Sequence, residues 1–310
     1  MVQHQEINAS LLRRIENSGF GHFIGTIYPG VKVQKITINA GTSCPNRDGS
    51  RGRGGCSFCL NSAFSPAFAQ AQRSITEQLE KGKEFFSRKY KDMKYLAYFQ
   101  TYTSTYQDVS NVMAQYREAL SCPDVVGLVV STRPDCMPNE LLSFLREVAQ
   151  KYLVIVEYGV ESTLDSSLVR INRGHTFAEA KEAIQRTADF GLRVGVHLIL
   201  GLPGEMEHDV IEHARVISRL PISLVKLHQL QVLRGTAMAH LYEKQPHLFV
   251  PLTPDSYAQM CLSFVSHLRE DIHLDRFVSQ SPKHLVLAPD WNIKNFEFHH
   301  LLIKKAQSFL

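Results

Sequence analysis

The chain has 310 residues, of which 44% are hydrophobic and 21% are charged, a balance typical of folded globular proteins. We expect no membrane span and no secretory signal, because no long apolar run is present, and a cytoplasmic location follows. The net charge of +4 permits an anionic partner such as RNA without requiring one. Six cysteines are too few for a disulfide framework in a chain of this length.

Short apolar segments recur along the chain and alternate with more polar stretches. Six of them are rich in valine, isoleucine, leucine and aromatic residues, and they lie at 33–41, 94–102, 125–132, 152–160, 193–200 and 223–232. Nearly continuous apolar character is typical of strands that are buried on both faces, as in a parallel sheet.

The stretches between these segments carry the start signals of helices. Ser74 with Glu77, and Thr176 with Glu179, form capping-box patterns. Pro138 starts another helical pattern, PNELLSFLREVAQ (138–150), at a position that proline tolerates. A further helix is expected over 253–268, beyond the last predicted strand.

Strands that alternate with helices indicate right-handed βαβ units. A complete eight-unit barrel takes about 250 residues, whereas six units fit here between residues 33 and 232. The sequence therefore predicts an α/β fold, a partial (β/α)6 TIM-like barrel over 31–235. Residues 1–30 would form an N-terminal helix and loop, and 236–310 a C-terminal extension packed on the barrel.

Three cysteines, Cys44, Cys56 and Cys59, lie in one glycine-rich loop directly after the first predicted strand. That position is the rim of a parallel barrel where catalytic groups collect. Thiolates favour zinc, copper(I) or iron–sulfur clusters, and both a structural zinc ion and a typical 4Fe–4S cluster take four ligands. Two interpretations remain open. Either three thiolates hold a cluster with one open iron, or a zinc ion recruits His22, Cys136 or His175.

Strand alternation predicts which side chains point into the barrel. The inward set contains ionisable groups from three strands: Glu157, Glu161, His197, Lys226 and His228. Burying such groups without partners is unfavourable, so their convergence suggests a functional cavity. We take four of them as catalytic candidates for proton transfer or for binding a carboxylate: Glu157, His197, Lys226 and His228. The alternative is an internal network of satisfied ion pairs.

The loop CPNRDGSRGRGGCSFC (44–59) resembles that of the radical S-adenosylmethionine (SAM) superfamily, in the branch of the elongator catalytic subunit and most closely the YhcC/YtqA group. Phe58 matches an aromatic that this superfamily places before its third cysteine. Further resemblances follow in the same order along the chain: FQTYTSTY (99–106), STRPD (131–135), EYGVES (157–162), RINRGHT (170–176), LGLPGE (200–205), LHQLQVLRGT (227–236) and APDW (288–291).

The resemblance implies a barrel of the radical SAM type and two cofactors. A 4Fe–4S cluster would be held by Cys44, Cys56 and Cys59, and SAM would bind its open iron. The residues that match SAM-contacting positions of the family are Phe58, Gln100, Thr101, Tyr102, Ser131, Arg133, Glu161, Arg173, Gly201 and Pro203. The chain departs from the pattern at Thr101 and Tyr102, which replace glycines, and at Glu161, where relatives often have glutamine. No role is assigned to Cys122, Cys136 or Cys261.

The resemblance also implies a reaction. Reductive cleavage of SAM, with electrons from a flavodoxin or ferredoxin-type reductant, would give a 5′-deoxyadenosyl radical. The substrate would be tRNA, with a wobble-uridine side chain converted from a carboxymethylaminomethyl to an aminomethyl type. The alternatives are a radical SAM enzyme acting on a small metabolite or a protein, and a non-catalytic zinc-binding protein.

Overall fold

The computed structural model describes residues 2–88, 92–291 and 293–308, so the outermost residues of the expected terminal segments lie outside the described residues. Its centre is a seven-stranded sheet in which all neighbouring strands are parallel. In spatial order the strands are β1 (Lys32–Ile38), β2 (Met93–Phe99), β3 (Val125–Thr132), β4 (Leu153–Glu161), β5 (Arg193–Leu200), β6 (Leu224–Gln229) and β8 (His273–Arg276). The predicted α/β partial barrel is confirmed.

The observed strands differ from the predicted ones mainly at their ends. The strands predicted at 125–132 and 193–200 match residue for residue. The one predicted at 223–232 ends at Gln229, because the chain turns and forms β7 (Val232–Leu233), which pairs with β9 (Val286–Ala288). The seventh parallel strand, β8, comes from the C-terminal part and was not predicted.

Helices follow most strands. The two predicted capping boxes are confirmed, whereas the helix predicted to start at Pro138 begins at Asn139, with Pro138 as its N-cap. Both capping boxes form, with Ser74 and Thr176 each accepting a hydrogen bond from the backbone of the glutamate three residues on. The helices are α1 (Val2–Glu16), α2 (Phe20–Ile27), α3 (Pro45–Asp48), α4 (Ile75–Ser87), α5 (Val109–Ser121), α6 (Asn139–Val148), α7 (Asp165–Arg170), α8 (Phe177–Asp189), α9 (Glu207–Ser218), α10 (Ala237–Lys244), α11 (Pro254–His267) and α12 (Asn295–Gln307). Short 3-10 turns are η1 (Asn61–Ala63), η2 (Pro134–Cys136), η3 (Pro246–Leu248) and η4 (Lys283–Leu285). None of the described helices combines the length and apolar character needed to traverse a lipid bilayer.

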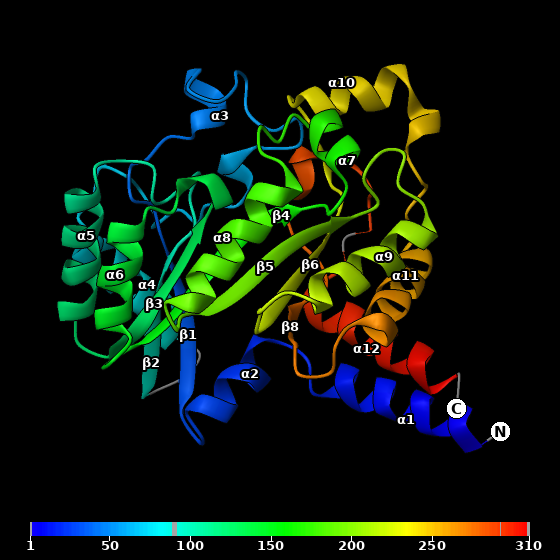
Figure 1. Cartoon of the computed structure of the whole chain (residues 1–310), viewed down its shortest axis with the longest axis horizontal. Coiled ribbons are helices and arrows are strands. Elements are labelled where there is room, and N and C mark those ends of the chain that lie inside the picture. The colour runs from blue at the N-terminus through cyan, green and yellow to red at the C-terminus, as the bar shows by residue number, and fades with distance from the viewer. Residues whose placement is uncertain (1, 89–91, 292, 309–310) are drawn as a thin grey trace.

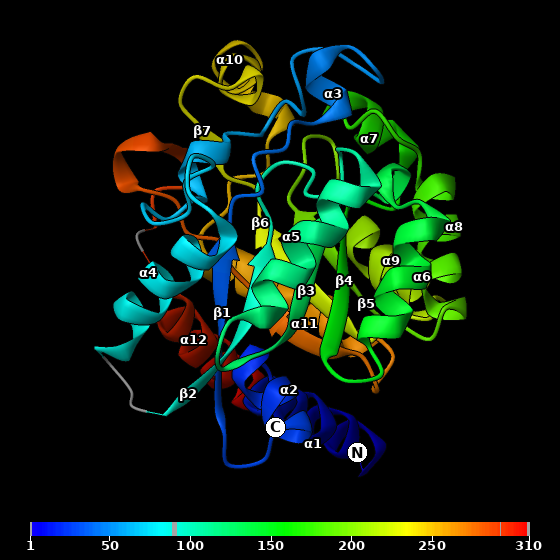
Figure 2. The same ribbon diagram turned by 90° about the vertical axis from the view of Figure 1, so that its left-hand side faces the viewer.

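The sheet curls, and helices cover its outer face (Figure 1, Figure 2). We call the space enclosed by the inner face the lumen; inward strand residues such as His197 and His228 line a cavity there. The residues that alternate with the predicted inward set belong to the main hydrophobic core between sheet and helices; they are Val154, Val156, Val160, Val196, Leu198, Leu200, Val225 and Leu227. The predicted alternation of these strands is therefore confirmed, and the opposite faces line the lumen.

Helix α2 closes the lumen at the end where the strands begin. Phe23 and Ile24 of this helix are buried against inward residues of the sheet, including Leu96, Val129 and Ile155. The cysteine loop with α3 lies at the opposite end, together with α7 and α10 (Figure 1, Figure 2). The lumen is thus floored by apolar side chains and opens at the carboxyl ends of the strands, where parallel barrels place their active sites.

Candidate functional site

A cavity of about 470 Å³ occupies the open end of the lumen. All three loop cysteines line it, and so do the two histidines of the predicted inward set. Of the predicted site residues, the wall contains Cys44, Cys56, Phe58, Cys59, Gln100, Tyr102, Ser131, Arg133, Glu161, Arg173, His197 and His228. Residues far apart in the sequence, from Cys44 after β1 to Gln280 after β8, therefore meet at one cavity, because these loops follow strands of one curled sheet.

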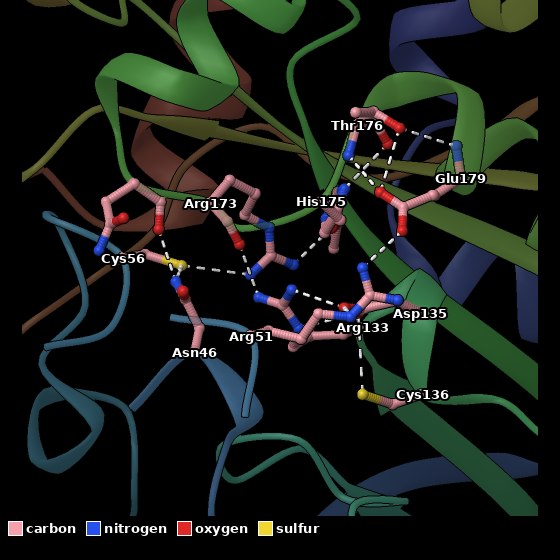
Figure 3. Close-up of polar contacts among 12 residues, drawn as sticks. Asn46, Arg51, Cys56, Arg133, Asp135, Cys136, Arg173, His175, Thr176 and Glu179 are labelled. Carbon is pink, nitrogen blue, oxygen red and sulfur yellow. Dashed lines mark hydrogen bonds and ion pairs between the residues drawn. The ribbon is translucent and has the colours of Figure 1, made fainter. Parts of the chain in front are cut away.

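The thiol of Cys56 is surrounded by hydrogen-bond donors. Arg173 Nη1 lies 3.3 Å from Cys56 Sγ, and Asn46 Nδ2 lies 3.6 Å from it (Figure 3). Burial, and then the neighbouring cysteines, raise the pKa of Cys59 to about 12. A bound metal ion or cluster would oppose this shift at Cys59, and the N–H groups directed at the sulfur of Cys56 are typical of thiolate–metal centres.

The glycines of the cysteine loop are explained by Asn46. This side chain also donates to the carbonyl oxygen of Asn172, at 2.5 Å, and so joins the loop to the segment after β4. A Cβ atom at Gly52 or at Gly174 would collide with Asn46 Oδ1, and Gly174 has a φ of +73°. Glycine at these two positions therefore allows the close approach that brings Cys56 and Arg173 together.

Arg173 and Glu161 form a buried pair beside Cys56. Arg173 Nη2 donates to the carbonyl oxygen of Gly159 at 2.5 Å and lies 3.5 Å from Glu161 Oε1. Glu161 has a φ of +69°, and the pairing register with β5 shifts between Gly159 and Glu161. Burial raises the pKa of Glu161 although Arg173 opposes the shift. Active sites often retain residues with a strained backbone, and Glu161 combines such a backbone with a carboxylate at the cavity wall.

Arg133 braces the segment that carries Arg173. Its Nε and Nη2 donate to the two carboxylate oxygens of Asp135, both at 2.9 Å, and its Nη1 donates to the carbonyl oxygen of Arg173 at 2.7 Å (Figure 3). Most donors of Arg133 are thereby engaged within the protein. The carbonyl oxygen of Ser131 accepts from Ser104 Oγ at 2.8 Å, which fixes the end of β3.

Three residues of the predicted cofactor set lie outside the cavity wall. Thr101 is buried and donates to Asn39 Oδ1 at 3.1 Å. The Cα of Gly201 faces the side chain of Leu252, and the carbonyl oxygen of Pro203 accepts from Arg170. Their proposed contacts with a cofactor stay predictions.

Below the cavity, four charged side chains form what we call the ion cluster: Lys35, Glu157, Lys226 and Asp275. Lys226 Nζ lies 2.7 Å from Glu157 Oε2 and 3.6 Å from Asp275 Oδ2. Lys35 Nζ lies 3.0 Å from Glu157 Oε1 and 2.7 Å from Asp275 Oδ2. Two ammonium groups therefore offset two carboxylates.

Glu157 and Lys226 are consequently engaged with partners and do not line the cavity. Burial alone would raise the pKa of Glu157, but Lys226 and Lys35 hold it well below its usual range. Tyr98 Oη donates a further hydrogen bond to Glu157 at 2.9 Å. For these two of the four catalytic candidates, the geometry favours the internal ion-pair network, and it leaves Lys226 little capacity to hold a carboxylate.

His197 and His228 line the cavity above the ion cluster, with ring centroids 5.5 Å apart. His197 Nε2 lies 2.9 Å from Glu157 Oε2. Burial, and then Lys226, lower the pKa of His197 to about 4. Burial, and then Arg276, lower the pKa of His228 well below its usual range. Both rings are therefore neutral near pH 7 and present hydrogen-bonding nitrogens rather than charges.

The low pKa of His197 predicts a loss of stability in mild acid. The unfolded chain takes up a proton at this histidine near pH 6.5, whereas the folded chain does so only near pH 4, so folding is disfavoured as the pH falls through this window. We expect the urea midpoint to fall between pH 7 and pH 5, and to fall less in His197→Gln. The exposed His247→Gln is the matched control and should keep the wild-type slope. An equal slope in His197→Gln would contradict a neutral buried ring.

Sequence reasoning missed five residues of this site: Lys35, Asn46, Tyr98, Asp275 and Arg276. Lys35 and Tyr98 lie on predicted strands, so the alternation applied to the later strands would have found them. Asp275 and Arg276 belong to β8, which is only four residues long and carries little apolar signal. Nothing in the spacing marked Asn46.

The candidate fourth ligands of a zinc site occupy different places. His22 lies on α2, which closes the opposite end of the lumen. The ring nitrogens of His175 lie 3.1 and 3.3 Å from the carbonyl oxygens of Thr176 and Gly159, and Cys136 Sγ lies 3.7 Å from Asp135 Oδ1 (Figure 3). In the described part of the chain no three His, Cys, Asp or Glu side chains are arranged to hold a single metal ion. Of the three candidates, His22 therefore lies at the other end of the barrel from the loop cysteines (Figure 1).

The chain is similar to proteins of known families over most of its length. Residues 40–217 match the profile of the radical SAM superfamily, and 222–307 match that of the radical SAM C-terminal domain. Protein YhcC of Escherichia coli is 38% identical over 263 residues, which are 84% of this chain and 83% of YhcC. The uncharacterized protein YtqA of Bacillus subtilis is 32% identical over 279 residues, 90% of this chain and 86% of YtqA.

More distant similarities concern part of a protein or the fold alone. A tRNA uridine(34) acetyltransferase of Methanocaldococcus infernus is 30% identical over 123 residues, 38% of this chain and 22% of that protein. The structure of archaeal M. infernus Elp3 superimposes with a TM-score of 0.68 at 16% identity, over 90% of this chain and 63% of the Elp3 chain. The chain therefore belongs to the radical SAM superfamily, within the YhcC/YtqA group, and is an enzyme whose cofactors are a 4Fe–4S cluster and S-adenosylmethionine.

Proposed function

We propose that Cys44, Cys56 and Cys59 hold the cluster, and that the chain modifies the side chain of the wobble uridine of tRNA. The observation that carries the proposal is one cavity with two ends, thiols at the rim and a histidine pair deep in the lumen. When bound, the two cofactors would supply the chemistry of hydrogen-atom abstraction by a 5′-deoxyadenosyl radical. A flavodoxin or ferredoxin-type protein would supply the electron.

The side chains around the cysteines fit this cofactor pair. Three thiols, rather than four, share the cavity, which suits a cluster that leaves one iron for SAM. Buried polar atoms without a partner among the described residues gather here as well, namely Asn46 Oδ1, Ser57 Oγ, Thr103 Oγ1 and Arg173 Nε. Buried polar groups of this kind normally have partners, so their concentration beside the cysteines suits a site built for bound groups.

Arg173 and Glu161 are the residues we assign to SAM. A zwitterionic amino-acid group needs a cation for its carboxylate and an anion for its ammonium group, and this pair offers both at the cavity wall. Neutral His197 and His228, at the inner end, would face the substrate and exclude water from the reacting carbon.

The tRNA assignment rests on similarity and on shape. The partial relative named tRNA uridine(34) acetyltransferase supports a uridine of tRNA as the substrate. Phe64 and Tyr102 are exposed at the cavity rim, where aromatic rings are suited to stack on a nucleobase. We propose conversion of a carboxymethylaminomethyl group to an aminomethyl group, in which water would release the two carbons as glyoxylate and SAM would be the two-electron oxidant, leaving methionine and deoxyadenosine.

The decisive experiment is deoxyadenosine release by the anaerobically reconstituted enzyme with bulk tRNA from a strain that lacks the protein. We expect tRNA to increase release and the carboxymethylaminomethyl uridine in the tRNA hydrolysate to be replaced by the aminomethyl form. The matched control is tRNA from the wild-type strain, which is already modified and should give no increase. Unchanged wobble uridines with wild-type enzyme would contradict the tRNA assignment and favour the metabolite or protein alternative.

A further inference from the structure

Arg276 forms the inner wall of the cavity beside the two histidines. It follows Asp275 in β8, where the pairing register with β6 shifts so that Val225 is opposite Leu274 and Lys226 is opposite Arg276. The shift leaves Asp275 in the ion cluster and turns Arg276 toward the cavity. The backbone of Arg276 is opposite Lys226, but its side chain reaches His228, and both Arg276 and His228 line the cavity.

Arg276 carries a charge that the described residues do not offset. The two lysines and two carboxylates of the ion cluster compensate one another, and both histidines are neutral. No carboxylate in the described ranges pairs with Arg276. Its Nη2 contacts His228, at 3.2 Å from Nδ1, and its Nε has no partner among the described residues. The inner end of the cavity thus holds one net positive charge.

The wall around Arg276 is held in place by three glutamines. Gln229 donates to the carbonyl oxygen of Ser279 at 2.8 Å and accepts from its backbone N–H at 2.7 Å. Gln231 accepts from Ser281 Oγ at 2.8 Å, and Gln280 donates to the carbonyl oxygen of Ile293 at 3.2 Å. The segment after β8 is therefore fixed to β6, to Gln231 just after β6 and to Ile293, so Arg276 faces a preformed wall.

We propose that Arg276 binds a carboxylate of the substrate and thereby places the adjoining carbon at the inner end of the cavity. Arg276 is partly buried, and a partly buried cation is stabilised when an anion pairs with it; a planar guanidinium also matches a planar carboxylate. One net positive charge is offset by a singly charged group such as a carboxylate, whereas a phosphate monoester would bring about two negative charges. This inference rests on the proposed function for the identity of the whole substrate, and it assigns to Arg276 the role that the sequence suggested for Lys226.

The test uses a small probe and no tRNA, so it is independent of the substrate assignment. N-benzylglycine carries an aromatic ring, an aminomethyl link and a terminal carboxylate. N-benzylglycinamide has the same shape and the same amine but lacks the negative charge of the carboxylate. We expect the acid, but not the amide, to raise the melting temperature of the reconstituted protein in a saturable way. In Arg276→Gln its dissociation constant should increase about tenfold or more, because a charge-assisted hydrogen bond is lost.

Two variants separate the charge of Arg276 from its effect on folding. Arg276→Lys keeps the cation and should retain a preference for the acid over the amide, whereas the exposed Arg234→Gln should bind the acid as the wild type does. Equal binding of acid and amide by the wild type overturns the proposal, and so does unchanged binding of the acid by Arg276→Gln. Stabilisation by inorganic phosphate but not by the acid would also overturn it.

If the probe binds as expected and tRNA still fails to stimulate deoxyadenosine release, the carboxylate site stands and only the tRNA assignment fails. If tRNA is modified and binding of the probe does not depend on Arg276, the tRNA assignment stands and the proposed carboxylate site fails.

Discussion

Replacing Cys44, Cys56 or Cys59 by alanine is expected to remove the cluster and to reduce deoxyadenosine release to background. The cavity offers three thiols and no fourth cysteine on its wall, so the loss of one leaves too few ligands for a cubane. The measurement is iron and sulfide per chain after anaerobic reconstitution, together with the visible absorption of the cluster. The wild type should hold about four irons per chain.

Two further cysteines provide the controls. Cys261 is fully buried in α11, within the main core, and Cys261→Ala should keep the iron at the cost of a small cavity. Cys136→Ala tests the candidate fourth ligand and should also keep the iron. Retained iron in any of the three loop variants would contradict the assignment. Loss of iron in Cys136→Ala would show that the fourth corner is occupied by protein and closed to SAM.

Most of the barrel could be predicted because its signals are local. A buried parallel strand is a short run of apolar residues, and the runs at 125–132 and 193–200 gave the observed strands residue for residue. The capping boxes at Ser74 and Thr176 depend on residues three apart. By contrast β8, four residues long with Asp275 and Arg276 at its end, is a strand only because β6 supplies an exposed edge.

Those residues of the candidate site that a single loop or strand positions could be predicted from the sequence. The cysteines share one loop, and alternation placed His197 and His228 on inward faces. The partners of these side chains were not predictable, because a pairing such as Lys35 with Asp275 joins residues 240 positions apart. Lys226 consequently looked like an available cation in the sequence, whereas the folded chain has already neutralised it.

The ion cluster and the cavity above it use ionisable side chains for different purposes: the cluster stabilises the fold, and the cavity presents groups to a ligand. Below, each lysine is within ion-pair distance of Glu157 and Asp275, and the charges are buried and fixed. Above, the histidines are held neutral and a single guanidinium faces the cavity. A rigid, neutral base under a site with one net charge allows that charge to act on a ligand instead of on a neighbouring side chain.

Glu157→Gln is expected to reduce the free energy of unfolding by about 3–5 kcal/mol, the typical effect of removing one partner of a buried ion pair. Glu157 is 2% exposed and receives both lysines, Tyr98 and His197. A glutamine would turn an N–H donor toward other donors and would leave two ammonium groups facing Asp275 alone. The measurement is the urea unfolding curve of the protein without cofactors at pH 7.

Two controls rank the effect. Tyr98→Phe removes one hydrogen bond to the same carboxylate and should cost about 1.5–3 kcal/mol, while Glu80→Gln, in an exposed pair with Lys83, should cost less than about 1 kcal/mol. Because the folded pKa of Glu157 is depressed, its contribution is complete above about pH 4.5 and is lost as the pH falls through the folded value. The difference in the free energy of unfolding between wild type and Glu157→Gln should therefore be constant from pH 7 to about pH 5 and become smaller below that. A gap near zero at pH 7 would mean that the lysines find other partners, and the neutral base beneath the histidines would then not depend on Glu157.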